Sequence, residues 1–335
     1  MTRLVSLRGI AWALFATLSS FALLELAIEL ADAAPPALAS YPIWNDKLDP
    51  ELLADTGLFR YAPQCLWEPR PGVADVQLDG HRGQPLPEHE DGVLCIAAIG
   101  DATTFGNSLN SSQAWPALLE FELGEHGVAA HVLNFGVPEH STFQGCARFA
   151  ARVAAVHPDL VIACFGEYAD RRYAPAGDDD AERVRRAMLL DCTCNRLTDR
   201  FSSLRWLRQV VEGDGQEPRI HSLERVPAQL MRESLQALRD TVQDGGAKLL
   251  LIAAPVPPEH PRVKEVLASS PGDLVRLAAD LKVPVVRADK ALAALPPSEV
   301  FLGPAWWTPN AHAIVARETL AAAQRLKLLA PRSEH

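Results

Sequence analysis

The chain has no excess of positive charge, few cysteines and a single long apolar run. Its 335 residues carry 42 Asp and Glu against 32 Lys and Arg, which gives a net charge of −10. No basic stripe interrupts this acidic balance, so nucleic acid is disfavoured as a partner. The composition, 48% hydrophobic and 22% charged, is typical of globular proteins and predicts that most of the chain folds.

Six cysteines are too few and too scattered for a disulfide framework. Cys95 and Cys164 fall inside predicted buried strands, where a thiol acts as a small apolar group. Cys192 and Cys194 form a Cys-x-Cys pair in a polar stretch, with no second Cys or His pair nearby. We therefore expect a loop thiol or a disulfide there rather than a metal site, and the sequence predicts neither a metal nor a cofactor.

The one long apolar run lies at the N-terminus. Two arginines precede it, residues 9–24 carry no charge, and two glutamates follow. This charge distribution predicts that the remainder of the chain is exported. We expect residues 1–34 to be an uncleaved, single-pass membrane anchor. The alternative is a signal peptide that is cleaved near Ala31-Asp32-Ala33, which would release a secreted protein.

The rest of the chain divides into an extension and a domain. Residues 35–91 are rich in proline and show little periodicity, which is typical of an irregular layer packed on a domain. Residues 92–330 alternate strands with helices and predict an α/β fold. The expected architecture is a flavodoxin-like, doubly wound parallel sheet of about five strands in three α/β/α layers.

The expected strands and helices can be given as ranges. Strands are predicted over residues 93–99, 128–135, 159–165, 248–254 and 283–287. Helices are predicted over residues 116–125, 141–156, 226–242, 272–281 and 310–328. Residues 170–215 are charged and then amphipathic, which predicts a helical excursion with Leu204, Trp206 and Leu207 packing inward.

Residues 92–106, GVLCIAAIGDATTFG, are the stretch around which the domain is organised. Val93–Ile99 is apolar and uncharged, which predicts a strand buried on both faces. Gly100–Gly106 then follow at the carboxyl end of that strand, where parallel sheets hold their active crevice. The stretch resembles block I of the GDSL, or SGNH, hydrolase family, in which Gly-Asp-Ser carries the nucleophile. Ala102 stands in the place of that serine.

Further segments extend the resemblance over nearly the whole chain. Residues 134–138 are similar to block II, whose glycine, here Gly136, helps to form the oxyanion hole. Residues 165–170 occupy the place of block III, with Tyr168 where the family has asparagine. Thr308-Pro309-Asn310-Ala311-His312 resembles the tail of block V. Counting back from that tail puts Gly303 at the family's aspartate and Trp306 at its histidine, while a register one residue later gives Pro304 and Trp307.

The resemblance implies the SGNH hydrolase fold but an incomplete catalytic site. The family's chemistry needs a hydroxyl nucleophile, a histidine base and an orienting aspartate. Ala102, Trp306 and Gly303 supply none of these groups. Loss of the nucleophile or the base alone costs on the order of 10⁶ in kcat. The substitutions predict a catalytically degenerate hydrolase, in which the oxyanion-hole positions would be the amides of Ala102 and Gly136 with the Tyr168 hydroxyl.

An alternative is an active ester hydrolase or O-acyltransferase whose catalytic groups have moved. The candidate groups near the predicted crevice are Asp101, Thr103, His140, Glu167, Asp170 and His312. Each also has a simpler interpretation. The Thr103 side chain is expected to point elsewhere, His140 is a loop histidine, and His312 belongs to the block V tail. Asp101 is expected to fix a turn, and Glu167 and Asp170 flank two arginines in a solvated cluster.

The exchanged positions also suggest binding roles. Trp306 and Trp307 either fill the emptied pocket or stack on a ligand, with Glu167, Tyr168 and Asp170 as polar contacts. An exported, anchored relative of ester-handling proteins implies a glycan or an acylated envelope polymer as that ligand. A third hypothesis is a structural component of a membrane assembly, with residues 199–219 as the surface that binds a protein partner of unknown identity.

Overall fold

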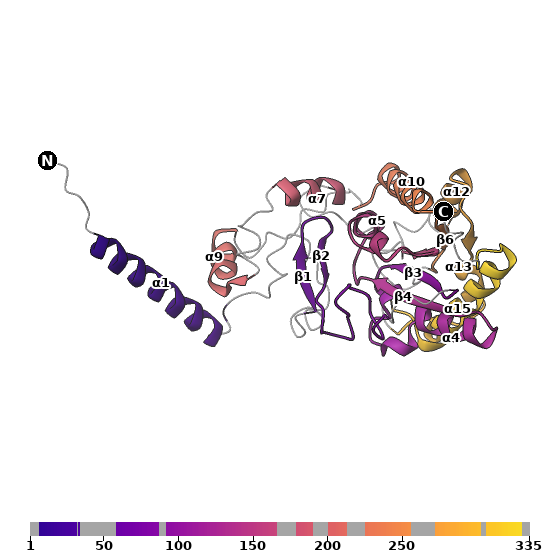
Figure 1. The fold of residues 1–335 in the computed structure, drawn as a ribbon, viewed down its shortest axis with the longest axis horizontal. Helices are drawn as coiled ribbons and strands as arrows, with labels where there is room; N and C mark the ends of the chain where they lie inside the picture. The colour runs from indigo at the N-terminus through magenta and orange to yellow at the C-terminus, as the bar shows by residue number, and fades with distance from the viewer. Residues whose placement is uncertain are drawn as a thin grey trace.

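The structure is a computed structural model that describes residues 7–31, 33, 58–86, 92–165, 179–189, 200–212, 225–255, 272–302 and 306–329. Within these ranges the chain forms a sheet domain, a layer packed on one end of it, and a separate N-terminal helix (Figure 1).

A five-stranded parallel sheet is the centre of the fold. Its strands are β3 (Leu94–Gly100), β4 (Ala130–Gly136), β5 (Leu160–Cys164), β6 (Lys248–Ile252) and β7 (Val285–Val286). Their order is β4-β3-β5-β6-β7, and every neighbouring pair is parallel. The chain enters the sheet at β3, adds β4 on one side of it, and then adds β5, β6 and β7 in turn on the other side, as in flavodoxin-like folds. The five predicted strands and the predicted fold class are confirmed.

Helices cover both faces of the sheet (Figure 1). One layer comprises α4 (Trp115–Glu125), α13 (Ala288–Leu292), α14 (Pro297–Val300) and α15 (Pro309–Arg325). The other comprises α5 (Thr142–Ala151), α10 (Ala228–Asp244) and α12 (Gly272–Asp280). The five predicted helices are confirmed, except that the second ends at Ala151 and a 3₁₀ turn, η2 (Val153–Val156), follows it. A hydrophobic core lies between each helix layer and the sheet. Alternate residues of each strand belong to the one core or the other, because successive side chains point to opposite faces of the sheet.

The expectation of little regular structure in residues 35–91 is wrong for one segment. Strands β1 (Phe59–Ala62) and β2 (Leu66–Pro69) pair in an antiparallel hairpin. Their apolar side chains form a third core together with Phe105 and Val137 from the sheet domain. Strands of four residues are too short to produce a recognisable alternation of apolar and polar residues, so the sequence pattern gave no signal.

Arg82 fastens this layer to the sheet domain. Its backbone amide donates to the Asn134 carbonyl oxygen at 2.7 Å, extending the edge of β4. Its guanidinium donates to the carbonyl oxygens of Phe105, Gly106 and Leu109 at 2.7, 3.0 and 2.7 Å. The Gly80-His81-Arg82-Gly83 element therefore supports the stretch that follows β3.

The N-terminal helix α1 (Leu7–Leu30) projects away from the domain (Figure 1). Residues 8–30 are long and apolar enough to cross a membrane, a property that a signal sequence shares. Near its C-terminal end lies α9 (Ser202–Glu212). The expectation that Trp206 and Leu207 pack inward is wrong, because both side chains are exposed.

Candidate active site

The carboxyl end of β3 turns directly into the short helix α3 (Ala102–Phe105). Asp101 caps this helix: its Oδ1 accepts from the Thr103 amide at 2.9 Å and from the Thr103 hydroxyl at 2.7 Å. Asp101 therefore has the turn-fixing role that the sequence suggested. The Thr103 hydroxyl, which was a candidate nucleophile, is directed at a carboxylate and not at a histidine.

Ala102 is the first residue of α3 and is almost buried, with 7% of its surface exposed. Within the described part of the chain its backbone amide donates to no acceptor. This amide is therefore a remaining donor of the kind that an oxyanion hole uses. The side chain of Ala102 is a methyl group and supplies no nucleophile.

Two glycines hold α3 against the sheet. A Cβ atom on Gly100 would lie 1.9 Å from the Cys164 carbonyl oxygen, and one on Gly136 would lie 2.3 Å from the Phe105 amide nitrogen. Both contacts are with backbone, which cannot swing aside. Gly100 also pairs with Gly136 on β4 and with Cys164 on β5, so three strand ends are level beside α3.

The Gly136 amide, which the resemblance places at an oxyanion hole, takes part in a hydrogen bond within the fold. It donates to Asn134 Oδ1 at 3.0 Å, and the same side chain donates through Nδ2 to the Thr104 carbonyl oxygen at 2.9 Å. The Asn134 side chain thus joins β4 to α3, and the Gly136 amide helps to hold that side chain in place. Three residues later Glu139 has a left-handed φ of +65°, which is unusual for a residue with a side chain, and the sequence analysis did not single it out.

Cys164 is another group beside Thr103, with its sulfur 3.8 Å from the Thr103 hydroxyl oxygen. The thiol is buried, and burial raises its pKa to about 12. The thiolate is the nucleophilic form of cysteine, so this thiol is not a nucleophile near neutral pH. Its location in β5 agrees with the expected role as a small apolar group.

His140 lies in the loop after β4 and is completely buried. Its Nε2 lies 2.8 Å from the Trp67 carbonyl oxygen, and its ring packs edge-on against Trp67 at 5.2 Å. Burial, assisted by the Arg148 charge, lowers its pKa to about 3. His140 is therefore neutral at pH 7 and donates its Nε2 proton to a carbonyl group.

His312 is buried in the first turn of α15. Its Nδ1 accepts from the Trp115 amide at 3.0 Å, and burial followed by the Arg82 charge lowers its pKa to about 3. Among the described residues, no hydrogen bond of His140 or His312 involves a hydroxyl group. The structure thus shows neither histidine paired with a nucleophile.

A buried polar network that the sequence analysis missed lies beside His140. Asp180, the first residue of α7 (Asp180–Leu189), accepts from the Ser141 hydroxyl at 2.6 Å and from Arg225 at 2.9 Å. Arg225 also donates to Gln144, whose amide donates to the Cys65 carbonyl oxygen at 2.7 Å. The network joins α5, α7 and the hairpin, and its members are buried and paired with one another. It stabilises the packing of these elements and offers no free hydroxyl.

The two tryptophans have different environments. Trp307 is fully buried in the core beneath α15, with its ring 5.5 Å from that of His312. It fills space and presents no face to a ligand, so the stacking role suggested for it is corrected. Trp306 is partly exposed, and its carbonyl oxygen accepts from the Leu302 amide at 2.8 Å. Only Trp306 of the pair can present its ring to a ligand.

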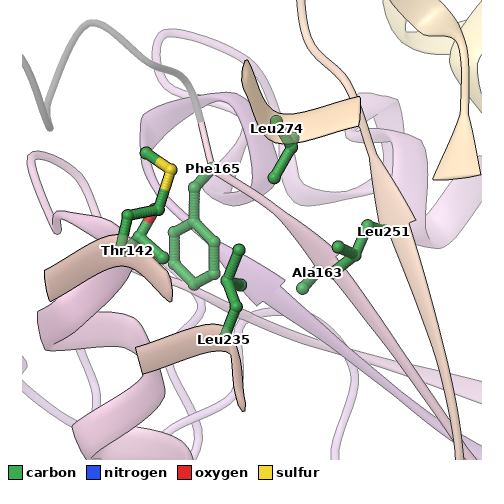
Figure 2. Close-up of a pocket in the computed structure, with 7 residues that line it drawn as sticks. Thr142, Ala163, Phe165, Leu235, Leu251 and Leu274 are labelled. Carbon is green, nitrogen blue, oxygen red and sulfur yellow. The ribbon is translucent and has the colours of Figure 1, made fainter. Parts of the chain in front are cut away.

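A small apolar pocket lies at the carboxyl ends of β5 and β6 (Figure 2). The Phe165 ring occupies its middle, and the other lining residues are Thr142, Ala163, Met231, Leu235, Leu251 and Leu274. Its volume of about 10 Å³ is at the lower limit for one water molecule. This pocket is packing space between the sheet, α5, α10 and α12 and does not hold a ligand as it stands.

Several expected site residues lie outside the described residues: Gly303, Pro304, Glu167, Tyr168 and Asp170, together with Cys192 and Cys194. Among the residues that are described, no cluster of three or more His, Cys, Asp or Glu side chains is arranged to hold a metal ion.

No known family profile and no curated protein matches the chain. Solved structures do. A lipase/acylhydrolase from Enterococcus faecalis is 18% identical, with 72% of this chain and 100% of that chain covered and a TM-score of 0.46. The acetylxylan esterase Axe2 from Geobacillus stearothermophilus is 15% identical over 68% of this chain and 93% of that chain, with a TM-score of 0.44. A protein from Desulfitobacterium hafniense DCB-2, assigned to the lipolytic G-D-S-L family, is also 15% identical, with 68% and 98% covered and a TM-score of 0.44. These similarities concern the fold.

Proposed function

We propose that the protein is a catalytically degenerate member of the SGNH/GDSL hydrolases with a binding role at the cell envelope. The observation that carries the proposal is the set of residues at the carboxyl end of β3. Ala102 replaces the nucleophile, and the two buried histidines near this end of the sheet contact a carbonyl group and an amide instead of a hydroxyl.

The electrostatics of these histidines support the same conclusion. A general base is most effective when its pKa lies near the working pH. Burial lowers the pKa of both His140 and His312 to about 3. A base of that strength takes a proton from a hydroxyl group poorly, even if a substrate brought the two together. The relocated-chemistry alternative therefore has no supporting group among the described residues.

The location at the envelope is proposed from α1. Its uncharged stretch is followed by acidic residues and then by a folded domain, as expected for an anchor with the domain on the outer side. The proposed ligand is a glycan, in particular an acylated envelope polysaccharide, since the resemblance is to proteins that handle esters. Trp306 would provide the stacking surface, because aromatic rings pack well against sugar faces.

Catalytic degeneracy is tested with the full chain in detergent and p-nitrophenyl acetate as the substrate. We expect a rate equal to that of a heat-denatured sample. Turnover above this control that disappears in Thr103→Ala would refute the proposal and identify relocated chemistry instead. The variant Ala102→Ser/Gly303→Asp/Trp306→His asks in addition whether the scaffold supports the reaction when the family's groups are returned.

Ligand binding is tested separately by thermal-shift titration with acetylated and deacetylated envelope polysaccharides. We expect a raised melting temperature with the acetylated polymer and a loss of that shift in Trp306→Ala. The matched control is Phe121→Ala, because Phe121 is an exposed aromatic residue on α4 outside the proposed site. An equal shift in the wild type and in Trp306→Ala would exclude the stacking role.

A further inference from the structure

Helix α9 exposes an apolar face that no described residue covers. Trp206, Leu207 and Val210 are 38%, 50% and 58% exposed. At about 100° per residue these three side chains lie within one third of the helix circumference, while Arg205 lies about 140° from Val210. An exposed apolar face of this kind beside basic residues is typical of helices that lie in a membrane interface.

The N-terminus of α9 is fixed to α1. The Glu25 carboxylate accepts hydrogen bonds from the backbone amides of Ser202 and Ser203, the second at 2.9 Å. Phe21, one turn earlier on α1, packs edge-on against Phe201 at 5.2 Å. A carboxylate that caps the first amides of a helix also interacts favourably with the helix dipole. The two helices therefore have a defined mutual position.

The exposed fractions of the α1 side chains show which side of this helix contacts the rest of the protein. Phe21, Glu25 and Ile28 are less exposed than their neighbours, and their spacing places them on one stripe of the helix. The large apolar residues elsewhere on the helix, such as Trp12 and Leu18, are exposed. The stripe faces α9, and the remaining surface of α1 is left for lipid.

The position of Glu25 sets the depth at which α9 lies. The uncharged residues 9–24 span about 24 Å as a helix, which is most of the hydrocarbon thickness of a bilayer. Glu25 follows immediately, so in a membrane-spanning α1 its carboxylate lies at the boundary between acyl chains and headgroups. The α9 amides that Glu25 binds must lie at the same level.

We infer that α9 lies in the outer headgroup region of the bilayer that α1 spans, with Trp206, Leu207 and Val210 inserted among the lipids. The inference rests on the membrane anchoring given under the proposed function. Tryptophan favours the membrane–water interface, and Arg200 and Arg205, near the N-terminal end of α9, supply positive charge for lipid phosphates. With α1 and α9 both in contact with the bilayer, the domain is held at two points instead of one.

The test uses the full chain in nanodiscs made with phospholipids whose acyl chains are brominated, and in otherwise identical unbrominated nanodiscs. Bromine quenches tryptophan fluorescence only at short range. The contribution of Trp206 is the difference between the wild type and Trp206→Phe, and that of Trp12 is obtained in the same way with Trp12→Phe. We expect both contributions to be lost in brominated nanodiscs.

A second pair of variants tests the apolar face itself. Leu207→Glu should restore much of the Trp206 emission in brominated nanodiscs and leave the quenching of Trp12 unchanged. The matched control is Leu78→Glu, because Leu78 is 89% exposed on the layer around the hairpin, and it should change neither signal.

The outcomes separate the inference from the anchoring on which it rests. Quenching of Trp12 without quenching of Trp206 would overturn the inference and favour a protein partner for α9. Quenching of Trp206 alone would support the lipid contact but refute a membrane-spanning α1. If neither tryptophan is quenched, both proposals fail.

Discussion

Acidification should destabilise the sheet domain through its two buried histidines. His140 and His312 are neutral in the folded protein, and burial lowers the pKa of each to about 3. In the unfolded chain an imidazole has a pKa of about 6.5. As the pH falls below 6.5, the unfolded state therefore takes up protons that the folded state cannot. The free energy of unfolding decreases accordingly, and it continues to decrease until the pH reaches about 3.

The magnitude follows from the size of this interval. Each pH unit between the two pKa values costs about 1.4 kcal/mol per histidine. Between pH 7.5 and pH 5.0 each residue therefore removes about 2 kcal/mol from the free energy of unfolding, and the two together remove about 4 kcal/mol. This is a large share of the roughly 5–15 kcal/mol that stabilises most domains.

His81 also changes the pH dependence of stability, so the effect of one buried histidine must be measured as a difference between the wild type and a variant. Burial lowers the pKa of His81, but the hydrogen bond that its Nδ1–H donates to the Asp79 carboxylate outweighs this effect, and the pKa is raised overall. A raised pKa stabilises the folded state as the pH falls through it, so His81 partly offsets the two buried histidines. The difference between the wild type and a variant that lacks one buried histidine removes this contribution.

The informative variant is His312→Asn, in which an amide oxygen takes the place of Nδ1 and can accept from the Trp115 amide. Urea unfolding of the full chain in detergent micelles is followed by tryptophan fluorescence at pH 7.5 and 5.0. The loss of stability between these pH values should be smaller by about 2 kcal/mol in the variant than in the wild type. His126→Asn, at an exposed position, is the control. Equal losses in His312→Asn and the wild type would refute the reasoning, because His312 would then titrate alike in both states.

Two further predictions concern contacts that hold the site together. Gly136→Ala places a Cβ atom 2.3 Å from the backbone of α3 and should destabilise the domain by about 3 kcal/mol or more in the same unfolding assay. The control is Gly124→Ala, because there is open space around the Cβ position of Gly124. It should be neutral or stabilising by up to about 1 kcal/mol. Arg225→Met removes one of the two arginines that pair with the buried Asp180 carboxylate, the other being Arg183, and should cost about 2–3 kcal/mol. Arg232→Met at a surface ion pair should cost no more than about 1 kcal/mol. Equal effects within either pair would contradict the assignment of that contact.

The sheet and its helices could be predicted because their signals are local. Uninterrupted apolar runs marked the buried strands, and Ser141, which caps α5, marked a helix start. The hairpin of β1 and β2 was missed because strands of four residues carry too little pattern. The exposure of α9 was misjudged because amphipathic periodicity identifies an apolar face without saying what covers it.

The turn after β3 was predictable in position, but its hydrogen bonding was not. The turn after β3 and the cap by Asp101 follow from a local motif. Which acceptor the Gly136 amide uses depends on how the Asn134 side chain folds back, and no sequence pattern specifies that rotamer. The contacts of Asp180 with Ser141 and Arg225 join residues 39 and 45 positions apart, so only the tertiary fold brings them together.

The residues around the turn after β3 have structural roles that do not depend on catalysis. Asp101 caps α3, the absence of side chains on Gly100 and Gly136 lets α3 approach the sheet, and Asn134 joins β4 to it. Replacing any of them would affect folding whether or not an ester is cleaved. The side chain of Ala102 takes no part in these contacts, because the cap and the close approach of α3 to the sheet are made by the other residues. Ala102→Ser alone should therefore neither unfold the domain nor create hydrolytic activity.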